Sequence, residues 1–427
     1  MSAETFVYFV LPGLLLVLGL PIFVVLILTS LVAVLFIAHV PTQAFQTYMF
    51  GSLDNFPLLA VPFFVLAGEI MGQGGIARRV VDWVVSIIGG VRGSLAVTTV
   101  ASSELFGAMA HTSVGTVVAV GRLLFPSLTS HGYGERFSVS LITSSGAVAV
   151  IIPPSISMIL YAMTAQQSAV RLFTAGILPS ILLGIVDAAY VLAYARIKMV
   201  PLSAPARWKN IWRTTREASW AIGTVVVIFG GIYGGVFTPT EAAGVAVVYS
   251  LFVAMFIYRE ITVADLWRIV VNSVFLISQI LIIVTAAGIY SWLMTTSGIP
   301  QHMISTIEAM HMPAWETLLL VNAGLLVAGS FLEPPAAILI LTPLLLPVVQ
   351  AAGINAIHFG IIMAVNLSIG LYMPPFGLNL FASRAIFELP LGTIYRGVIP
   401  FVLVNFVALL IITYVPAISM VLVTGLH

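Results

Sequence analysis

Two stretches of this chain repeat one another, one in each half of the sequence, and each interrupts an apolar segment with a pair of prolines. The first runs from Ser145 to Pro154 and reads SGAVAVIIPP, and the second runs from Asn366 to Pro375 and reads NLSIGLYMPP. Proline breaks a helix because it lacks a backbone donor and its ring clashes with the preceding turn. Two related halves, each with a broken span at the same place, are typical of a secondary transporter with its site at the breaks.

Shorter matches extend this internal repeat on both sides of the breaks. Pro126 and Gly132 correspond to Pro347 and Gly353 at the same offset as the two broken stretches. The segments 71–76 and 294–299 share the pattern Met-x-x-x-Gly-Ile at a slightly larger offset. These matches extend the internal repeat beyond the two broken stretches.

The composition places these halves in a membrane. Hydrophobic residues make up 60% of the chain and charged residues 7%, whereas a soluble domain carries about 25% charged residues. Spans of about 20 residues fit roughly ten to twelve times. The first apolar stretch, from Phe6 to His39, lacks a basic leader and a small-residue cleavage site, so we expect membrane helices there. The absence of cysteine excludes disulfides, thiol catalysis and thiolate metal sites.

Two apolar segments, 92–125 and 314–347, are too long for one crossing and have small or proline-rich centres. We predict that both are re-entrant hairpins, buried in protein or lining a cavity. Residues 74–136 contain five arginines, whereas residues 297–360 contain no Lys or Arg. Because Lys and Arg favour cytoplasmic loops, the first hairpin is expected to enter from the cytoplasm and the second from the opposite side. The halves are therefore predicted to be inverted repeats in an all-α polytopic membrane protein.

The most polar stretch, residues 197–218, joins the halves and carries Lys198, Arg207, Lys209, Arg213 and Arg216. Trp208, Ile211 and Trp212 share one face at helical spacing. Two compatible interpretations are an amphipathic helix on the cytoplasmic membrane surface and an arm that braces a moving domain. The first is favoured.

Oxygen-bearing and small residues gather at the breaks and the hairpin tips. A broken helix frees backbone carbonyls that coordinate cations, while helix N-termini attract anions. Such oxygen-rich, thiol-free groups suit a hard monovalent cation such as sodium. For single residues, helix packing and bonding to their own backbone are equally reasonable explanations. The candidates are Thr112, Ser113, Ser145, Gly146 and Ala149 in the first half, and Glu333, Asn366, Ser368 and Gly370 in the second.

Glu333 is the strongest single candidate for a functional residue, since a carboxylate inside the membrane is a functional hypothesis by default. The alternative is a capping carboxylate before Pro334, because proline is favoured in the first turn of a helix. Glu104 and His111 lie in the first hairpin, where a proton relay is one interpretation, and for His111 a hydrogen-bonded packing role is favoured. Glu69 and Asp187 are further intramembrane acids without an evident partner. Arg384 fits either an anionic substrate or the cytoplasmic bias of basic residues.

At these residues the chain resembles the large membrane subunit of the tripartite ATP-independent periplasmic (TRAP) transporters, over essentially all 427 residues. Five motifs carry the resemblance and are specific in combination. They are GAMAHTSVGT (107–116), IPPSI (152–156), FTPTEAAG (237–244), FLEP (331–334) and MPPFGLNLF (373–381).

The resemblance implies a sodium-coupled importer of the elevator type, in which a transport domain moves against a scaffold. It also implies a small integral membrane subunit and a soluble periplasmic binding protein that delivers a substrate, usually an organic acid, at the bacterial inner membrane. No ATPase and no nucleic acid would take part. The expected organisation is scaffold helices in 1–56, a first repeat in 57–196 with its broken helix at 137–165, a connector at 197–218, and a second repeat in 219–420 with its broken helix at 357–384.

Residue by residue, the resemblance implies two sodium sites and a substrate site between them. The family often has aspartate at the position of Glu333. The first sodium site would use Thr112, Ser113, Ser145, Gly146, Ala149 and Pro153, and the second Glu333, Asn366, Ser368, Gly370 and Pro374. The substrate would lie near Pro154, Ser155, Pro375 and Asn379.

Other functions fit less well. Stand-alone sodium-coupled carboxylate or ion transporters of the same superfamily would share the fold and need no binding protein, but segment 237–244 favours the tripartite family. Glu241-Ala242-Ala243 imitates a coupling motif of ABC permeases, yet no Ile-x-Leu-Pro follows it. The chain has no His-Glu-x-x-His, Gly-x-Gly-Asp or Gly-x-Ser-Gly motif, which argues against an intramembrane protease. We therefore expect a transporter and no enzyme.

Overall fold

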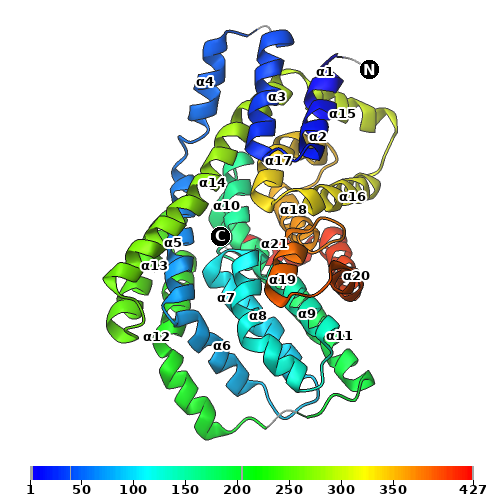
Figure 1. The fold of residues 1–427 in the computed structure, drawn as a ribbon. Helices are drawn as coiled ribbons and strands as arrows, with labels where there is room; N and C mark the ends of the chain where they lie inside the picture. The colour runs from blue at the N-terminus through cyan, green and yellow to red at the C-terminus, as the bar shows by residue number, and fades with distance from the viewer. Residues whose placement is uncertain (1–2, 39, 203–204, 426–427) are drawn as a thin grey trace.

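The computed structural model describes residues 3–38, 40–202 and 205–425, which form helices joined by loops, with no strand among them. Eight helices in these ranges are long and apolar enough to cross a membrane, and one bent pair adds a ninth crossing. This confirms the expected all-α polytopic membrane fold. Figure 1 shows an elongated bundle in which α5, α12, α13 and α14 form one side and the hairpins and broken helices the other.

The helices follow one another in two series. The first series consists of α1 (Ala3–Thr5), η1 (Phe6–Val10), α2 (Leu11–Val17), α3 (Ile22–Phe36), α4 (Thr42–Gly51), η2 (Phe56–Leu59), α5 (Ala60–Gln73), α6 (Ile76–Ile87), α7 (Ser94–Ala110), α8 (Ser113–Ser130), α9 (Glu135–Val148), η3 (Ala149–Ile151), α10 (Ile156–Thr164) and α11 (Ala169–Ile197). The second consists of α12 (Trp208–Tyr233), α13 (Pro239–Phe252), η4 (Val253–Ile257), α14 (Val263–Thr296), α15 (Ile299–Ala309), α16 (Ala314–Phe331), α17 (Pro334–Ala351), α18 (Ala356–Gly370), α19 (Leu378–Phe387), α20 (Leu391–Tyr414) and α21 (Ala417–Thr424).

The internal repeat of the sequence is visible as two matching series of helices, α5–α11 and α14–α20. Each series has a long helix, a shorter second helix, two hairpin helices, two parts of a broken helix and a closing helix. The hairpins α7–α8 and α16–α17 lie where re-entrant segments were expected. In Figure 1, α6 lies in the lower part of the molecule and its counterpart α15 in the upper part, as inverted halves require.

A left-handed glycine redirects the chain after the first long helix of each series. Gly75, between α5 and α6, has φ 72°, and Gly298, between α14 and α15, has φ 75°. Such values are readily adopted only by glycine, which explains why the Met-x-x-x-Gly-Ile pattern occurs in both halves. At Gly75, a Cβ atom would also overlap the carboxylate of Glu260.

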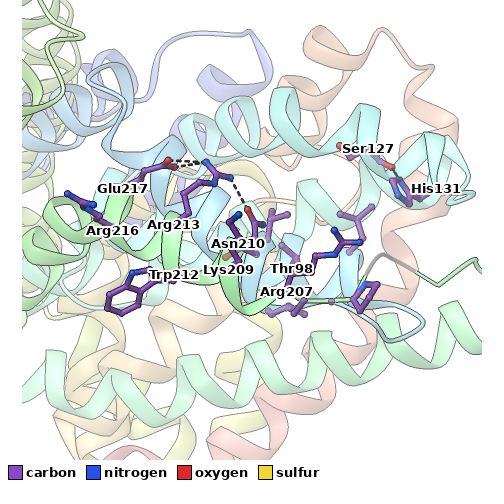
Figure 2. Close-up of a pocket in the computed structure, with 17 residues that line it drawn as sticks. Thr98, Ser127, His131, Arg207, Lys209, Asn210, Trp212, Arg213, Arg216 and Glu217 are labelled. Carbon is purple, nitrogen blue, oxygen red and sulfur yellow. Dashed lines mark hydrogen bonds and ion pairs between the residues drawn. The ribbon is translucent and has the colours of Figure 1, made fainter.

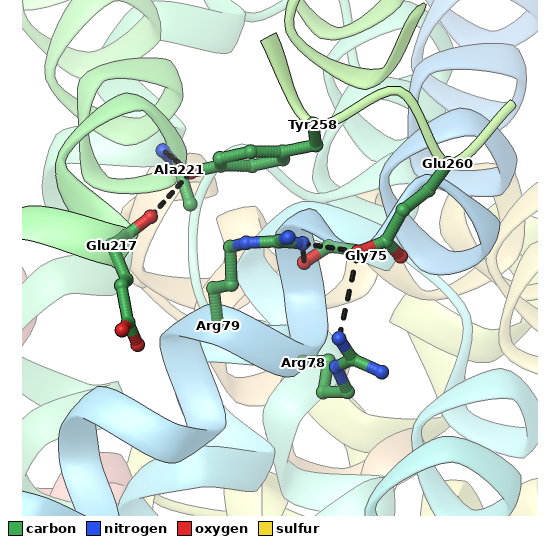
Figure 3. Close-up of polar contacts among 7 residues, drawn as sticks. All are labelled: Gly75, Arg78, Arg79, Glu217, Ala221, Tyr258 and Glu260. Atoms are coloured by element: carbon green, nitrogen blue, oxygen red, sulfur yellow. Dashed lines mark hydrogen bonds and ion pairs between the residues drawn. The ribbon is translucent and has the colours of Figure 1, made fainter. Parts of the chain in front are cut away.

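A polar cluster fixes α6 against α12 and the segment between η4 and α14 (Figure 3). The guanidinium of Arg79 donates to Glu260 at 2.6 Å and lies 3.8 Å from the ring centroid of Tyr258. The hydroxyl of Tyr258 donates to the carbonyl of Glu217 at 2.9 Å and accepts from the amide of Ala221 at 3.1 Å. Ion pair, cation–π contact and hydrogen bonds together hold α6 as a rigid arm.

Helix α13 explains the TEAAG part of segment 237–244. Thr238 caps this helix: its hydroxyl accepts from the amide of Glu241, and the Glu241 carboxylate accepts from the amide of Thr238 at 2.8 Å. Pro239 occupies the first helical position, where the lack of a donor costs nothing. Glu241 is therefore part of a capping box.

Residues 208–218, expected in a separate connector, form the first turns of α12, which continues without interruption to Tyr233. No proline or glycine occurs between Trp208 and Ile222, so nothing in the sequence ends a helix there. Trp208 and Trp212 remain exposed, at 78% and 67% of their surface. The amphipathic segment is thus the polar beginning of a longer helix.

The broken helices lie at the centre of the side of the bundle that carries both hairpins. Every residue of α18 is buried, and so are the residues of α9 from Phe137 onward. Outside them, α13 packs along α5, and α3 packs along α14. Each of these two outer pairs contains the first long helix of one series, α5 or α14.

Candidate functional site

Each hairpin turns within two residues, and both second arms begin in the same way. After α7, His111 adopts a left-handed conformation and Thr112 is extended before α8 begins at Ser113. After α16, Leu332 and Glu333 are extended before α17 begins at Pro334. Thr112 and Glu333 correspond to each other in the repeat and occupy the same N-cap position. The repeat thus gives the two tips equivalent positions with different chemistry, a hydroxyl and a carboxylate.

The first break lies against the first hairpin tip. Helix α9 passes into η3, and the chain then runs through Ile152–Ser155, with a cis bond between Pro153 and Pro154, into α10. A Cβ atom on Gly146 would lie 3.4 Å from the carbonyl oxygen of Ser113, and one on Gly107 would lie 2.7 Å from that of Ala149. The small residues therefore allow tip and break to approach within backbone contact.

The second break repeats this arrangement. Helix α18 ends at Gly370, and α19 begins at Leu378 after a second cis bond, between Pro374 and Pro375. A Cβ atom on Gly370 would overlap the carbonyl group of Gly329. In the repeat, Gly329 and Gly370 correspond to Gly107 and Ala149, to within one position. Both breaks therefore touch the first arm of their own hairpin through small residues.

Each break holds a buried side-chain oxygen with no hydrogen-bond partner among the described residues. In the first, Oγ of Ser145, which is 1% exposed, is one such oxygen, and in the second it is Oδ1 of Asn366, which is fully buried. Ser145 and Asn366 are the first residues of the two repeated stretches and so occupy equivalent positions. Asn366 is held in place because its Nδ2 donates to Oδ1 of Asn322 at 2.6 Å. Buried acceptors without donors suit cation ligands, so these atoms fit the oxygen-only site expected for sodium.

The other expected sodium ligands lie around these atoms. Thr112 borders the cavity described below, Gly146 and Ala149 face the first hairpin, and Pro153 follows η3. Ser368 is buried, and its hydroxyl donates to the carbonyl of Val365 at 2.9 Å, so its side chain is already bonded. In the described residues, no three His, Asp or Glu side chains cluster as a transition-metal site would require.

Asn379 joins the two halves. Its Oδ1 accepts from the hydroxyl of Ser113 at 2.9 Å, and its Nδ2 donates to the carbonyl of Thr143 at 3.3 Å. A second link forms between the hydroxyls of Thr143 and Ser383, 2.6 Å apart. Helix α19 of the second half is thereby bonded to both the tip and the broken helix of the first.

A cavity of about 220 Å³ lies between the two hairpin tips. The first residues of four helices border it: Ser113 of α8, Ile156 of α10, Pro334 of α17 and Leu378 of α19. Helix N-termini carry partial positive charge and unpaired amide donors. Four of them at one cavity favour an anionic ligand, although no Lys or Arg of the described residues lines it.

Glu333 and Gln279 add polar groups to this cavity. The Glu333 side chain borders it and makes no hydrogen bond or ion pair with any other described residue. Gln279 comes from α14, as do Leu276, Ile280 and Ile283, so this helix forms one wall. This wall was not predicted from the sequence, in which the pair Ser278-Gln279 within an apolar run is the only local signal.

The expected substrate residues are near this cavity but do not line it. Pro154 and Ser155 immediately precede Ile156, and Pro375 lies three residues before Leu378. Ser155 is 2% exposed, and its hydroxyl has no partner in the described part of the chain. His111 does line the cavity, and its ring packs edge-on against Phe64 with centroids 4.8 Å apart. Glu69 accepts a hydrogen bond from Gln73 at 3.0 Å, and Arg384 borders a separate surface pocket.

A larger cavity, of about 1230 Å³, lies at the arginine-rich end of the molecule (Figure 2). It is bordered by the end of α6, the base of the first hairpin and the beginning of α12. Arg207, Lys209, Arg213 and Arg216 line it, and Arg213 donates to Glu217 at 2.9 Å and to Asn210 at 2.8 Å. Its basic lining agrees with a cytoplasmic position, and it shares no lining residue with the cavity between the tips.

Comparisons with known proteins agree with this architecture. The family model described as "Tripartite ATP-independent periplasmic transporter, DctM component" matches residues 9–418. The C4-dicarboxylate TRAP transporter large permease protein DctM of Pseudomonas aeruginosa is 40% identical, with 88% of each chain covered. The isethionate TRAP transporter permease protein DctMQ of Oleidesulfovibrio alaskensis is 36% identical over 96% of this chain and 64% of that protein.

The fold also resembles a solved transporter structure. The YdaH transporter of Alcanivorax borkumensis superposes with a TM-score of 0.61, covering 87% of this chain and 88% of that chain at 14% sequence identity. At this identity the likeness concerns the fold alone. It agrees with the arrangement of helices derived above.

Proposed function

Because the chain belongs to the DctM-component family of tripartite ATP-independent periplasmic transporters, we propose that it is the large membrane subunit of a sodium-coupled importer of a small organic acid. The chain is a transporter subunit, not an enzyme, and a multi-pass protein of the bacterial inner membrane. Sodium coupling, the elevator movement and delivery by a periplasmic binding protein are parts of the proposal.

The convergence of four helix N-termini on the cavity between the tips is the observation that carries this proposal. A carboxylate bound there accepts hydrogen bonds from the free amides at the starts of α8, α10 and α19, while α17, which begins with Pro334 and Pro335, contributes the positive end of its dipole. The relatives named above for C4-dicarboxylates and isethionate indicate the substrate class, a small anion. The volume of about 220 Å³ suits a molecule of that size.

Coupling to sodium follows from the charge of Glu333. Its carboxylate borders the cavity and repels an anionic substrate when no cation is present. Sodium bound at the breaks offsets this charge and orders the hairpin tips, so sodium and substrate favour each other's binding reciprocally. The unpartnered oxygens of Ser145 and Asn366 support cation binding at both breaks. Glu333 completes the second site, and carbonyls of the breaks supply the remaining ligands.

The movement proposed for this chain carries the hairpins and the broken helices together. The bonds of Asn379 and Ser383 to Ser113 and Thr143 join parts of both halves into one body. Helices α3, α5, α12, α13 and α14 form the scaffold along which this body slides. The sodium gradient supplies the energy, because no nucleotide-binding motif occurs in the chain.

Two partners belong to the proposal. A small membrane subunit is supported by the relative named DctMQ, in which this chain corresponds to only 64% of the length. A periplasmic binding protein is supported by the family description itself. A stand-alone carrier with the same fold would need neither, so the two possibilities differ in their requirement for the binding protein.

Uptake into proteoliposomes tests the proposal. The chain and its small membrane subunit are reconstituted, and the cognate binding protein is added with a labelled organic acid, with and without an inward sodium gradient. Uptake that requires both sodium and the binding protein is expected. Sodium-driven uptake without the binding protein would instead identify a stand-alone carrier, and uptake that ignores sodium would refute the coupling.

A further inference from the structure

A second polar centre lies inside the side of the bundle that carries both hairpins, apart from the cavity between the tips. It consists of Glu104 of α7, Asp187 of α11 and Asn405 of α20, none of which lines that cavity. None of the three belongs to the sodium or substrate residues discussed above. Acids at membrane depth are costly, so an unexplained pair calls for a function.

Asp187 and Asn405 form the fixed part of this centre. Both side chains are fully buried, and Nδ2 of Asn405 donates to Oδ1 of Asp187 at 2.8 Å and to the carbonyl of Phe401 at 3.1 Å. The other two oxygens, Oδ2 of Asp187 and Oδ1 of Asn405, have no partner among the described residues. The pair thus presents two buried acceptors without a donor.

Glu104 approaches the same face of α11. A Cβ atom on Gly184 would overlap its Oε1 and lie 2.7 Å from its Oε2, so the carboxylate rests on the glycine backbone. Gly184 precedes Asp187 by three residues, which places them on one face of the helix, about 4.5 Å apart along its axis. Oε1 of Glu104 also lacks a partner in the described part of the chain. Three unpartnered acceptors from three helices therefore gather here.

No described cation compensates these acids. The four ion pairs of the described residues involve neither Glu104 nor Asp187. The titratable groups that face Asp187 are Tyr372, in the second break, and Tyr190, one turn further along α11. Arg136, on α9, interacts electrostatically with Tyr190.

The remaining helices that pack against α11 offer no charge to the pair. On α18, both ring nitrogens of His358 are within hydrogen-bonding distance of Ser419 or the carbonyl of Thr413. On α20, Arg396 is exposed, and Tyr395 donates to the carbonyl of Pro375, while α21 contains no titratable residue.

Two buried carboxylates without a cation are unstable in their fully charged form. We propose that Glu104 and Asp187 form a proton-binding site that loads and unloads during each cycle, so that a proton crosses with the sodium and the organic acid. This inference rests on the transport function proposed above. One proton binds a carboxylate oxygen on the outer side, crosses with the loaded domain and dissociates to the inner side, adding one positive charge to the cargo.

The surroundings favour a proton over a second metal ion. The contact between Glu104 and the backbone of Gly184 leaves no room for even a methyl group, whereas a proton needs no cavity. A proton also supplies the missing donor between neighbouring acceptor oxygens. The hydroxyl of Tyr372 lies beside Asn405 and near Asp187. Asp187 and Asn405 therefore lie next to the second break, where the helix is already interrupted.

The test measures proton entry together with substrate uptake. The complete transporter is reconstituted with a pH-sensitive dye in the lumen, and uptake is driven by an inward sodium gradient at equal pH on both sides. We expect luminal acidification that depends on the substrate in the wild type and its reduction to the level of protein-free liposomes in Asp187→Asn. Glu104→Gln provides a second, independent variant, and Asp54→Asn, an exposed acid in a loop, is the matched control that should acidify normally.

The outcomes separate this inference from the proposed function. Sodium-driven uptake without acidification in the wild type would overturn the proton site while leaving sodium coupling intact. Acidification that persists in both Asp187→Asn and Glu104→Gln would remove the assignment of these residues. If either variant fails to assemble, the wild-type measurement and the other variant still decide. Uptake that ignores sodium would refute the proposed coupling, and substrate-linked acidification could still be measured without a sodium gradient.

Discussion

Ser145 and its neighbour Ser144 are both buried serines of α9, but only one of them has a bonding partner. The hydroxyl of Ser144 donates to the carbonyl of Ser140 at 2.9 Å, whereas that of Ser145 has no partner among the described residues. An isolated buried hydroxyl is unfavourable unless something else uses it. The contrast supports the proposal that Ser145, unlike Ser144, is a ligand of a bound ion.

Ser145→Ala is therefore expected to weaken sodium binding and leave folding unchanged. Losing one oxygen ligand should raise the sodium concentration for half-maximal uptake about tenfold, equivalent to about 1.4 kcal/mol. Uptake measured against sodium concentration checks this, together with the thermal unfolding temperature. Ser144→Ala is the matched control and should keep the wild-type sodium dependence. Equal sodium curves for all three proteins would remove Ser145 from the site.

Glu333→Gln tests the electrostatic basis of coupling. The substitution keeps the shape of the side chain and removes its charge, so the sodium requirement should rise by about 10- to 100-fold, or about 1.4 to 2.8 kcal/mol. Folding should change little, because Glu333 makes no hydrogen bond or ion pair with the described residues. Glu308→Gln, on the exposed side of α15, serves as control. Normal uptake by Glu333→Gln at limiting sodium would show that this carboxylate is not a coupling group.

At the level of elements, the second break depends on close backbone contact between α16 and α18. A methyl group on Gly370 would overlap the carbonyl group of Gly329, which cannot move aside as a side chain can. Gly370→Ala should therefore destabilise the protein by about 1 to 3 kcal/mol and impair uptake. Gly324→Ala, at an open position of α16, should be neutral or stabilise by up to about 1 kcal/mol. Thermal unfolding in detergent compares the two variants, and equal stability would contradict the packing argument.

Elements that depend on residues within their own segment could be predicted from the sequence. The broken helices and hairpins follow from Gly and Pro at membrane depth, and the turns before α6 and α15 from the repeated glycine. The merging of residues 208–218 into α12 was not predictable by composition, because polarity changes there while helix formation continues. The role of α14 as a cavity wall was not predicted for a related reason. Gln279 is a single polar residue in an apolar helix, and it borders a cavity only because the hairpin tips pack near α14.

At the level of the whole molecule, the decisive contacts join residues far apart in the chain. Ser113 and Asn379 are separated by 266 residues and Asp187 and Asn405 by 218. No periodicity or motif indicates such pairs, because they depend on how the two halves interlock. The sodium candidates could be named from the sequence since they sit on the repeat itself. The second polar centre could not be assembled from the sequence, since Glu104, Asp187 and Asn405 lie on three separate helices.

The proposed movement predicts that joining the scaffold to the mobile body stops transport. The natural chain has no cysteine, so introduced pairs react without background. Ile280→Cys on α14 and Val114→Cys on α8 line the same cavity from opposite bodies, and a short bifunctional maleimide should join them and abolish uptake. The double variant Ser86→Cys with Thr214→Cys is the control. In the wild type the hydroxyls of Ser86, on α6, and Thr214, on α12, lie 2.7 Å apart. A cross-link between these two helices should leave uptake intact, because α6 is held against α12. Uptake that continues after complete cross-linking of Ile280→Cys with Val114→Cys would mean that α8 and α14 do not move past each other, and the elevator mechanism would then be wrong for this protein.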